Sequence, residues 1–434
     1  MSKKIKQKMS KAEITFNIFS LIFLVGFSCF YGYRMIHYKN KLAPKTSEGE
    51  TIVLLSNKIK ENVITTGEGL YNENNVFVYK GKDINNYVKY SNMLFRIIKI
   101  NKDNTIEMIL DDTLNYMAYD EEKINYNKSN IREYLNDILY TDIKSELLIK
   151  GTYCTDEIDD ANNVTCNNIE TDYIKLLTLT DYLNSKKDNE SYLNTEDVIW
   201  LNNSNKEEVW LLNEGNLSLS KPNELYKVKP VITITSLAVF SGGDGTQENP
   251  YTIQRDALYY GAYVKLDEDL YRIYDETEST FKLQAEKEYN EGNIKYNFSF
   301  SSNKFNTEEG IGEYLNTTIY EDLSYKNLLV DCETYTGSYN SNYKNVLEEK
   351  ITSKIGLTNI LDPIFNKEKT NYYLSTPFEE NEIYIYNDGV YGVKTNLVRN
   401  ISLSVCINKD KLTEGKGTKE EPYILKSEVQ EWEK

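Results

Sequence analysis

The stretch YVKYSNMLFRIIKI, residues 87–100, decides the fold because it returns later in the chain as YVKLDEDLYRIYDE, residues 263–276. The alignment places Tyr87 on Tyr263 and Arg96 on Arg272. Apolar and polar residues alternate within both stretches, which is typical of half-buried β-strands. Similarity at a fixed distance along the chain indicates a duplicated unit.

Three further blocks recur in the same order. The stretch IREYLNDILYTDI, from residue 131, matches IGEYLNTTIYEDL, from residue 311. Later, WLNNSNKEEVWLLNEGNL matches YLSTPFEENEIYIYNDGVY, and SGGDGTQENPYTI matches TEGKGTKEEPYIL. The offsets vary only from 172 to 180 residues, which favours a duplicated domain over a short solenoid repeat. We predict a first repeat at residues 66–256 and a second, diverged repeat at residues 257–428.

Each repeat is expected to combine strands with one helix. Alternating apolar residues in FVYKG, LFRIIKI and TIEMIL indicate strands in the first repeat. An apolar stripe at helical spacing follows, formed by Ile131, Tyr134, Leu135, Ile138 and Leu139. Asn130 and Glu133 resemble a capping box at the start of that helix. Strands return in VIWL, EVWLLN and VKPVITI, so we predict an α+β fold class with two tandem mixed α+β modules.

The first 65 residues differ from the rest in charge and hydropathy. Residues 1–45 carry nine lysines and arginines against one acid, about +8, and subtracting this from the formal net charge of −17 leaves about −25 on the remainder. Residues 14–33 hold no charged residue and are long enough to cross about 30 Å of hydrocarbon. We predict a cytoplasmic basic tail at 1–13, a transmembrane helix at 14–33 in contact with membrane lipid, and a stalk at 34–65. A cleaved signal peptide is the alternative, but no small-residue cleavage site follows.

The cysteines help to decide which side of the membrane the bulk of the chain occupies. Basic residues give only a slight excess to the N-terminal side. Cys154 and Cys166 bound the polar stretch TDEIDDANNVT, and such a pair is typical of a disulfide in an oxidising compartment. We predict this disulfide, a cytoplasmic N-terminus and an extracellular bulk; two unrelated thiols in a reduced protein are the alternative.

The recurring blocks also carry a resemblance. NNYVKYSNMLFRIIKINKDNTIEMI, DYIKLLTLTDYLN, VWLLNEGNL, YKVKPVITI and GGDGTQENPYTI together resemble a repeat module of membrane-anchored surface proteins of low-GC Gram-positive bacteria. More distantly, the order of YLN, WL or YLSTP, a Gly turn and VKPVI resembles the C-type-lectin-like fold of the formylglycine-generating enzyme group. Those enzymes depend on a late cysteine pair, whereas Cys406 stands alone in ISLSVCIN and Cys332, the expected counterpart of Cys154, lacks a following partner.

The inventory of reactive residues argues against catalysis. The single histidine, His37, lies beside the predicted membrane segment, so no Ser-His, Cys-His or His-metal site is expected in the repeats. We predict no cofactor and no metal. Asp111 with Asp112 and Asp159 with Asp160 are the obvious carboxylate pairs for a glycosidase, but adjacent acids in polar loops are typical of solvated surface. The acidic body argues against nucleic-acid binding.

Two other features are candidate binding sites. Trp200 and Trp210 flank a polar turn and suggest an aromatic platform for a sugar or peptide, with two core aromatics as the alternative. The GGDGT stretch at residues 242–246 has the oxygen-rich look of a calcium loop. Its counterpart places Lys416 where Asp244 stands, which favours a tight closing turn.

The leading hypothesis is therefore a membrane-anchored, surface-displayed, non-catalytic binding or adhesion protein whose ligand is an extracellular glycan or protein. A duplicated module commonly serves avidity. The alternatives are a membrane-anchored cell-wall glycan hydrolase that uses paired carboxylates, and a structural or assembly subunit of the cell envelope.

Overall fold

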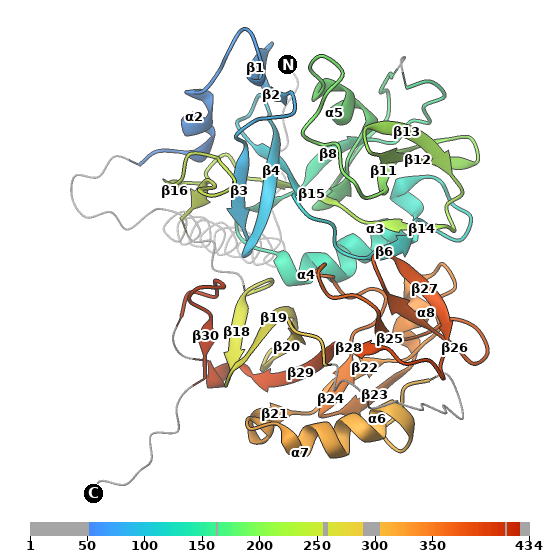
Figure 1. The fold of residues 1–434 in the computed structure, drawn as a ribbon. Coiled ribbons are helices and arrows are strands. Elements are labelled where there is room, and N and C mark those ends of the chain that lie inside the picture. Colours follow the sequence, from blue (N-terminus) through green and yellow to red (C-terminus); the bar gives the residue numbers. More distant parts are fainter. Residues whose placement is uncertain (1–51, 162–163, 255–258, 290–303, 413–414, 426–434) are drawn as a thin grey trace, which may run out of the picture. The chain divides into compact units, whose positions relative to one another are not determined.

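Two large and mainly antiparallel sheets, one in each repeat, carry the fold (Figure 1). The computed structural model describes residues 52–161, 164–254, 259–289, 304–412 and 415–425. From Val53 onward the described residues belong to one compact unit. All contacts described below lie within that unit.

The large sheet of the first repeat has the strand order β1-β2-β4-β5-β15-β10, with β3 beside β4 and β7 beside β15. Its strands are β1 (Gly69–Glu73), β2 (Val76–Lys80), β3 (Tyr87–Tyr90), β4 (Met93–Ile100), β5 (Ile106–Leu110), β7 (Leu148–Ile149), β10 (Ile174–Leu176) and β15 (Pro230–Ile234). All five residues of β5 and of β15 are buried, so these neighbouring strands form the centre of the core.

The large sheet of the second repeat follows the same plan, with the order β21-β29-β20-β19-β18-β30 and β24 beside β29. Its strands are β18 (Tyr263–Leu266), β19 (Asp269–Glu276), β20 (Thr280–Ala285), β21 (Leu329–Val330), β24 (Ile355–Leu357), β29 (Leu403–Asn408) and β30 (Tyr423–Ile424). Tyr87 lies opposite Arg96, and Tyr263 lies opposite Arg272. The repeated sequence thus forms the same hairpin twice.

Each repeat also has a smaller sheet that contains the repeated block starting at Trp200 or Tyr373. In the first repeat it contains β6 (Tyr116–Ala118), β11 (Ile199–Asn205), β12 (Glu208–Asn213), β13 (Asn216–Ser220) and β14 (Leu225–Lys227). In the second it contains β25 (Tyr372–Pro377), β26 (Glu382–Tyr386), β27 (Val390–Lys394) and β28 (Asn400–Ile401). Three two-stranded sheets pair β8 (Gly151–Cys154) with β9 (Ile169–Asp172), β22 (Cys332–Tyr335) with β23 (Lys350–Ser353), and β16 (Phe240–Gly242) with β17 (Thr252–Ile253).

The helices are short, and the predicted helix of each repeat is present with a π-helical turn in its middle. The first is α3 (Asn130–Tyr134), η2 (Leu135–Leu139) and α4 (Tyr140–Ile143); the second is α6 (Gly310–Tyr314), η3 (Leu315–Ile319) and α7 (Tyr320–Asp322). The first helix is capped by Ser129, whose side chain accepts from the Arg132 amide, and not by Asn130 as predicted. The others are α2 (Leu55–Lys60), η1 (Tyr126–Lys128), α5 (Leu179–Asn184), η4 (Lys326–Leu328), α8 (Tyr343–Glu348) and η5 (Lys409–Lys411).

One asparagine in each YLN block fastens the helix to the large sheet. The side chain of Asn136 accepts from the Ile174 amide and donates to the Ile174 carbonyl. Asn316 makes the same two bonds to Ile355. These paired bonds hold the π-helical turn against β10 or β24.

The α+β fold class is wrong. Strands hold about 40% of the described residues and helices only 15%, so the described fold is mostly β. Each repeat has one substantial helical segment, and most of the sequence between the blocks forms short strands and turns instead. Helical periodicity locates the helix at residues 130–143, but one such segment in each repeat does not make the class α+β.

No helix in the described part of the chain is long and apolar enough to cross a membrane. Residues 14–33, which were predicted to do so, lie outside the described residues, as do 1–13. The structure therefore gives no support to the transmembrane helix that the predicted fold included. Of the predicted stalk, α2 is described, and its Leu55 and Ile59 side chains are fully buried.

Candidate functional site

A cavity of about 180 Å³ lies where the helix of the first repeat meets the large sheet of the second. Tyr134, Ile138, Thr141 and Asp142 line it from that helix, and α4 lies against β19 (Figure 1). The rest of the lining comes from the second repeat. Both repeats are therefore needed to form this candidate site.

Three carboxylates and one ammonium group line the cavity. Asp142 lies on α4, Asp275 on β19, Lys282 on β20, and Asp362 on the loop after β24. The loop is held by the first repeat, because the Tyr134 hydroxyl donates to the Leu361 carbonyl at 2.7 Å. Asp362 in turn accepts from the Asn359 amide at 2.8 Å.

Burial changes the acidity of all three carboxyl groups. It raises the pKa of Asp142 well above its usual range, and the neighbouring Asp275 carboxylate adds to this. Burial also raises the pKa of Asp275, which Lys282 partly offsets. Burial raises the pKa of Asp362 to about 6, again against the effect of Lys282. The charged forms of the three carboxyl groups are therefore disfavoured, because burial and the neighbouring carboxyl groups outweigh the effect of Lys282.

Lys282 is buried without a hydrogen-bond acceptor. Its side chain is only 8% exposed, and its ammonium lies 5.4 Å from the centre of the Tyr274 ring and 5.3 Å from that of Tyr335. These are cation–π contacts. Within the described part of the chain, no hydrogen bond or ion pair joins it to any residue, although Asp275 is its cross-strand partner. The Nζ atom itself reaches the cavity, where a ligand or water can accept hydrogen bonds from its three donors.

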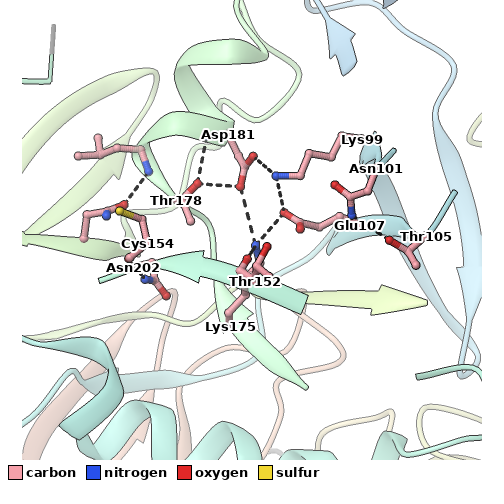
Figure 2. A network of polar contacts seen from close by, with 12 residues as sticks. Lys99, Asn101, Thr105, Glu107, Thr152, Cys154, Lys175, Thr178, Asp181 and Asn202 are labelled. Atoms are coloured by element: carbon pink, nitrogen blue, oxygen red, sulfur yellow. Dashed lines mark hydrogen bonds and ion pairs between the residues drawn. The ribbon is translucent and has the colours of Figure 1, made fainter. Parts of the chain in front are cut away.

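In the first repeat, the equivalent charged side chains form ion pairs with one another (Figure 2). There the Lys175 ammonium lies 2.9 Å from Glu107 and 3.9 Å from Asp181. The Lys99 ammonium lies 2.5 Å from Asp181 and 3.4 Å from Glu107. Two lysines and two acids therefore neutralise one another inside the first repeat.

Strand register identifies the equivalent positions in the second repeat. Lys99 pairs with Glu107 just after a bulge, and Asp275 pairs with Lys282 just after the equivalent bulge. The second repeat therefore has an acid in place of Lys99 and a lysine in place of Glu107. In β10, which pairs with β15, Lys175 follows the asparagine-bound Ile174; in β24, which pairs with β29, Gly356 follows Ile355.

The chain after that strand also aligns between the repeats. The Leu177 carbonyl accepts from Asn202, and the Thr358 carbonyl accepts from Ser375. This register places Asp362 on the position of Asp181. The second repeat thus keeps two acids and one lysine of the network but has glycine in place of the second lysine. Asp275, Lys282 and Asp362 line the cavity, whereas Gly356 lies against the Thr334 side chain.

Two disulfides are present. One joins Cys154 to Cys166, and the other joins Cys332 to Cys406. The expectation that Cys332 and Cys406 are both unpaired is wrong. Cys332 lies opposite Ser353 as Gly151 lies opposite Asp172, so its counterpart is Gly151, three residues before Cys154. Two disulfides are consistent with an extracellular protein.

Trp200 and Trp210 lie inside the first repeat and not on an exposed face. Trp200 is fully buried and Trp210 is 8% exposed. The indole N–H of Trp200 donates to the Met117 carbonyl at 2.8 Å, and that of Trp210 donates to Ile158 at 3.0 Å. These positions match the core alternative and leave no aromatic platform for a ligand.

The acidic pairs named from the sequence lie elsewhere. Asp111 and Asp112 line a second cavity of about 310 Å³ that also contains Arg272. Asp111 lies 3.9 Å from Arg96, and Asp112 forms an ion pair with Lys367 of the second repeat. Both carboxyl groups therefore lie next to cationic side chains of the protein itself. Asp159 and Asp160 lie in the segment between β8 and β9.

The GGDGT stretch forms a closed turn. Asp244 accepts from the Thr246 amide at 3.0 Å and from its hydroxyl at 2.8 Å. Gly243 has a φ of 87°, and a Cβ there would lie 2.0 Å from the Pro250 carbonyl oxygen. The Asp244 carboxylate is therefore hydrogen bonded within the turn. Position 243 requires glycine because its φ is positive and a Cβ would clash with the backbone.

Comparison with known proteins gives no match to a family model, a curated protein or a solved structure. The resemblances to the surface-protein module and to the C-type-lectin-like fold therefore stay predictions.

Proposed function

We propose that this chain is a non-catalytic binding protein of the extracellular space that takes a small polar ligand into the cavity between its two repeats. The observation that carries the proposal is Lys282, a mostly buried side chain whose ammonium group has no acceptor among the described residues and faces a cavity lined by three carboxyl groups. Ligand pockets commonly lie at such interfaces between structural units and use a few convergent polar groups. Attachment through residues 14–33 stays a prediction from the sequence, because those residues are not described.

In this proposal, the duplicated module does not serve avidity. Avidity requires the same site twice, whereas this cavity uses the helix of one repeat and the sheet of the other. A duplicated module here supplies two different halves of one site. The repeats are accordingly joined by direct contacts, such as the Ile364 amide donating to the Leu114 carbonyl at 2.7 Å.

Thermal-shift screening of the full-length chain against small metabolites and soluble glycans tests this proposal. A ligand that binds only the folded state raises the melting temperature by mass action. We expect at least one such ligand, and we expect Thr141→Trp to abolish its effect because exposed Thr141 lines the cavity. Glu321→Trp, an exposed position one residue after Tyr320 as Thr141 follows Tyr140, is the matched control. Equal responses of the two variants would contradict the proposal.

A glycan hydrolase is the second candidate, and the same cavity favours it over the loop acids. Glycosidases use two carboxyl groups that flank the scissile bond, and Asp362, Asp275 and Asp142 line one cavity. Incubation with purified cell-wall polymer tests it. Released fragments that disappear in Asp362→Asn would favour the hydrolase, and unchanged polymer would favour binding alone.

A further inference from the structure

The difference between the two repeats indicates which chemical group the ligand brings. In the first repeat, Glu107 and Asp181 share the Lys99 and Lys175 ammonium groups. In the second, the equivalent polar set is Asp275, Lys282 and Asp362, and Gly356 stands where Lys175 does. The group missing from the second repeat is therefore one ammonium.

Charge in the cavity points the same way. Asp142 from the first repeat adds a third carboxylate, and no described residue hydrogen bonds to it or forms an ion pair with it. Three carboxyl groups therefore face one ammonium. A cation in the cavity would favour the charged forms of these half-buried carboxyl groups, as Lys175 does for Asp181 in the first repeat, and charge-assisted hydrogen bonds are strong.

Lys282 sets a second requirement, because its donors need acceptors. Its contacts with the Tyr274 and Tyr335 rings attract the charge but accept no conventional hydrogen bond. Another ammonium alone would leave Lys282 unsatisfied. The ligand must carry an acceptor, such as a hydroxyl or a carboxylate, next to its cationic group.

Size limits the choice further. The cavity measures about 180 Å³. A ligand as small as one sugar ring or one amino acid is the simplest match for this volume. The tyrosine walls formed by Tyr134, Tyr260, Tyr274 and Tyr335 suit a compact ligand with CH groups between its polar ones.

We infer that the cavity binds a small primary amine that also carries a hydroxyl or carboxylate, its ammonium group facing Asp142, Asp275 and Asp362 and its acceptor facing Lys282. This inference rests on the proposed function and names the ligand class of that site. An amino sugar and an amino acid share the required chemistry, and the experiment separates them.

Isothermal titration calorimetry on the full-length chain tests the inference with two matched pairs of probes. Glucosamine is compared with glucose, and alanine with lactate, because each second compound replaces the amine with a hydroxyl group. We expect glucosamine or alanine to bind at least tenfold more tightly than its partner. The pair that shows the difference identifies the amino sugar or the amino acid as the source.

A variant pair locates the effect. Asp142→Asn is expected to weaken binding of the amine at least tenfold, because it removes one charged acceptor from the cavity. Asp322→Asn is the matched control, since Asp322 follows Tyr320 by two residues as Asp142 follows Tyr140 but is exposed. Gly356→Lys is unsuitable because a Cβ there would lie 1.9 Å from the Thr334 hydroxyl oxygen. A melting curve for each variant verifies folding.

Three results would overturn the inference: no binding by either amine, equal binding by an amine and its hydroxyl partner, or equal effects of the two asparagine variants. If the ligand screen meanwhile finds an amine-free compound that Thr141→Trp blocks, the inference fails while the proposed function stands. If no compound in any screen binds, both fail.

Discussion

The carboxyl group of Asp362 shows how a single residue couples the cavity to pH. Its pKa is raised by burial to about 6 from an ordinary value of 3.8. The folded state therefore holds this proton more tightly than the unfolded state does. Between these two pH values the folded state binds more protons, so stability decreases as the pH rises through that window.

We predict that Asp362→Asn removes this part of the pH dependence. A folded-state pKa about two above the unfolded value corresponds to about 3 kcal/mol at most, so wild type should lose roughly 1–3 kcal/mol of unfolding free energy between pH 4 and pH 7 that the variant keeps. Asp142, Asp275 and Lys282, which face the same cavity, remain in both proteins. Urea unfolding at the two pH values measures the difference, and parallel pH profiles would contradict the raised pKa of Asp362.

Lys175, unlike Asp362, forms ion pairs with oppositely charged side chains in a buried network. Its side chain is 2% exposed, and its ammonium also donates to the Thr152 carbonyl at 2.8 Å. Lys175→Met should leave Glu107 and Asp181 with one cation between them and destabilise the protein by about 3–5 kcal/mol. Chemical unfolding measures this. Lys350→Met, in an exposed ion pair with Glu333, should change little; similar losses in both variants would argue against the network.

At the scale of elements, the π-helical turn depends on one amide side chain. Asn136 and Asn316 each bind both main-chain polar groups of one strand residue. We predict that alanine at either position costs about 2–3 kcal/mol, because buried main-chain groups lose their partners. Thr317→Ala, an exposed neighbour, should stay within about 0.5 kcal/mol. If either asparagine variant unfolds at the wild-type urea concentration, its anchoring role is wrong.

The elements also show what the sequence could and could not reveal. Alternation in residues 87–100 and 263–276 located two hairpins, and the apolar stripe located the helix. The YLN block is visibly repeated, but the bonds of its asparagine depend on β10 or β24 lying beside the helix. That contact joins residues about 40 positions apart, so no local pattern encodes it. The fold class was missed because many strands are only two to four residues long, too short for a clear period.

At the scale of the whole molecule, the second disulfide connects distant parts of one repeat. Cys332 and Cys406 are 74 residues apart, against 12 for Cys154 and Cys166. Their counterparts in the first repeat, Gly151 and Thr233, are close together, since a Cβ at Gly151 would meet the Thr233 side chain. Comparison of the two repeats at the sequence level missed the bond because neither counterpart is a cysteine.

Loop length predicts different costs for losing the two disulfides. The chain-entropy relation gives about 4 kcal/mol for the 74-residue loop and about 3 kcal/mol for the 12-residue loop. We therefore expect the Cys332→Ala, Cys406→Ala double variant to unfold at lower urea than the Cys154→Ala, Cys166→Ala double variant. The reverse order would show that the longer bond does not constrain the unfolded chain as assumed.

The candidate site was beyond sequence reasoning for a related reason. Asp142, Asp275, Lys282 and Asp362 are spread over 220 residues and both repeats, and none belongs to a motif with a known spacing. The correspondence of Lys175 with Gly356 and of Asp181 with Asp362 depends on the strand register, so the loss of one lysine from the second repeat could not be read from the sequence.

A crystal structure of the full-length chain with the tightest ligand from the screen tests the central claim most directly. The account predicts ligand density between Asp142 and Lys282, with a cationic group on the carboxylate side and an acceptor at the Lys282 ammonium. Ligand density at another surface, with ordered water satisfying Lys282 in the cavity, would contradict it.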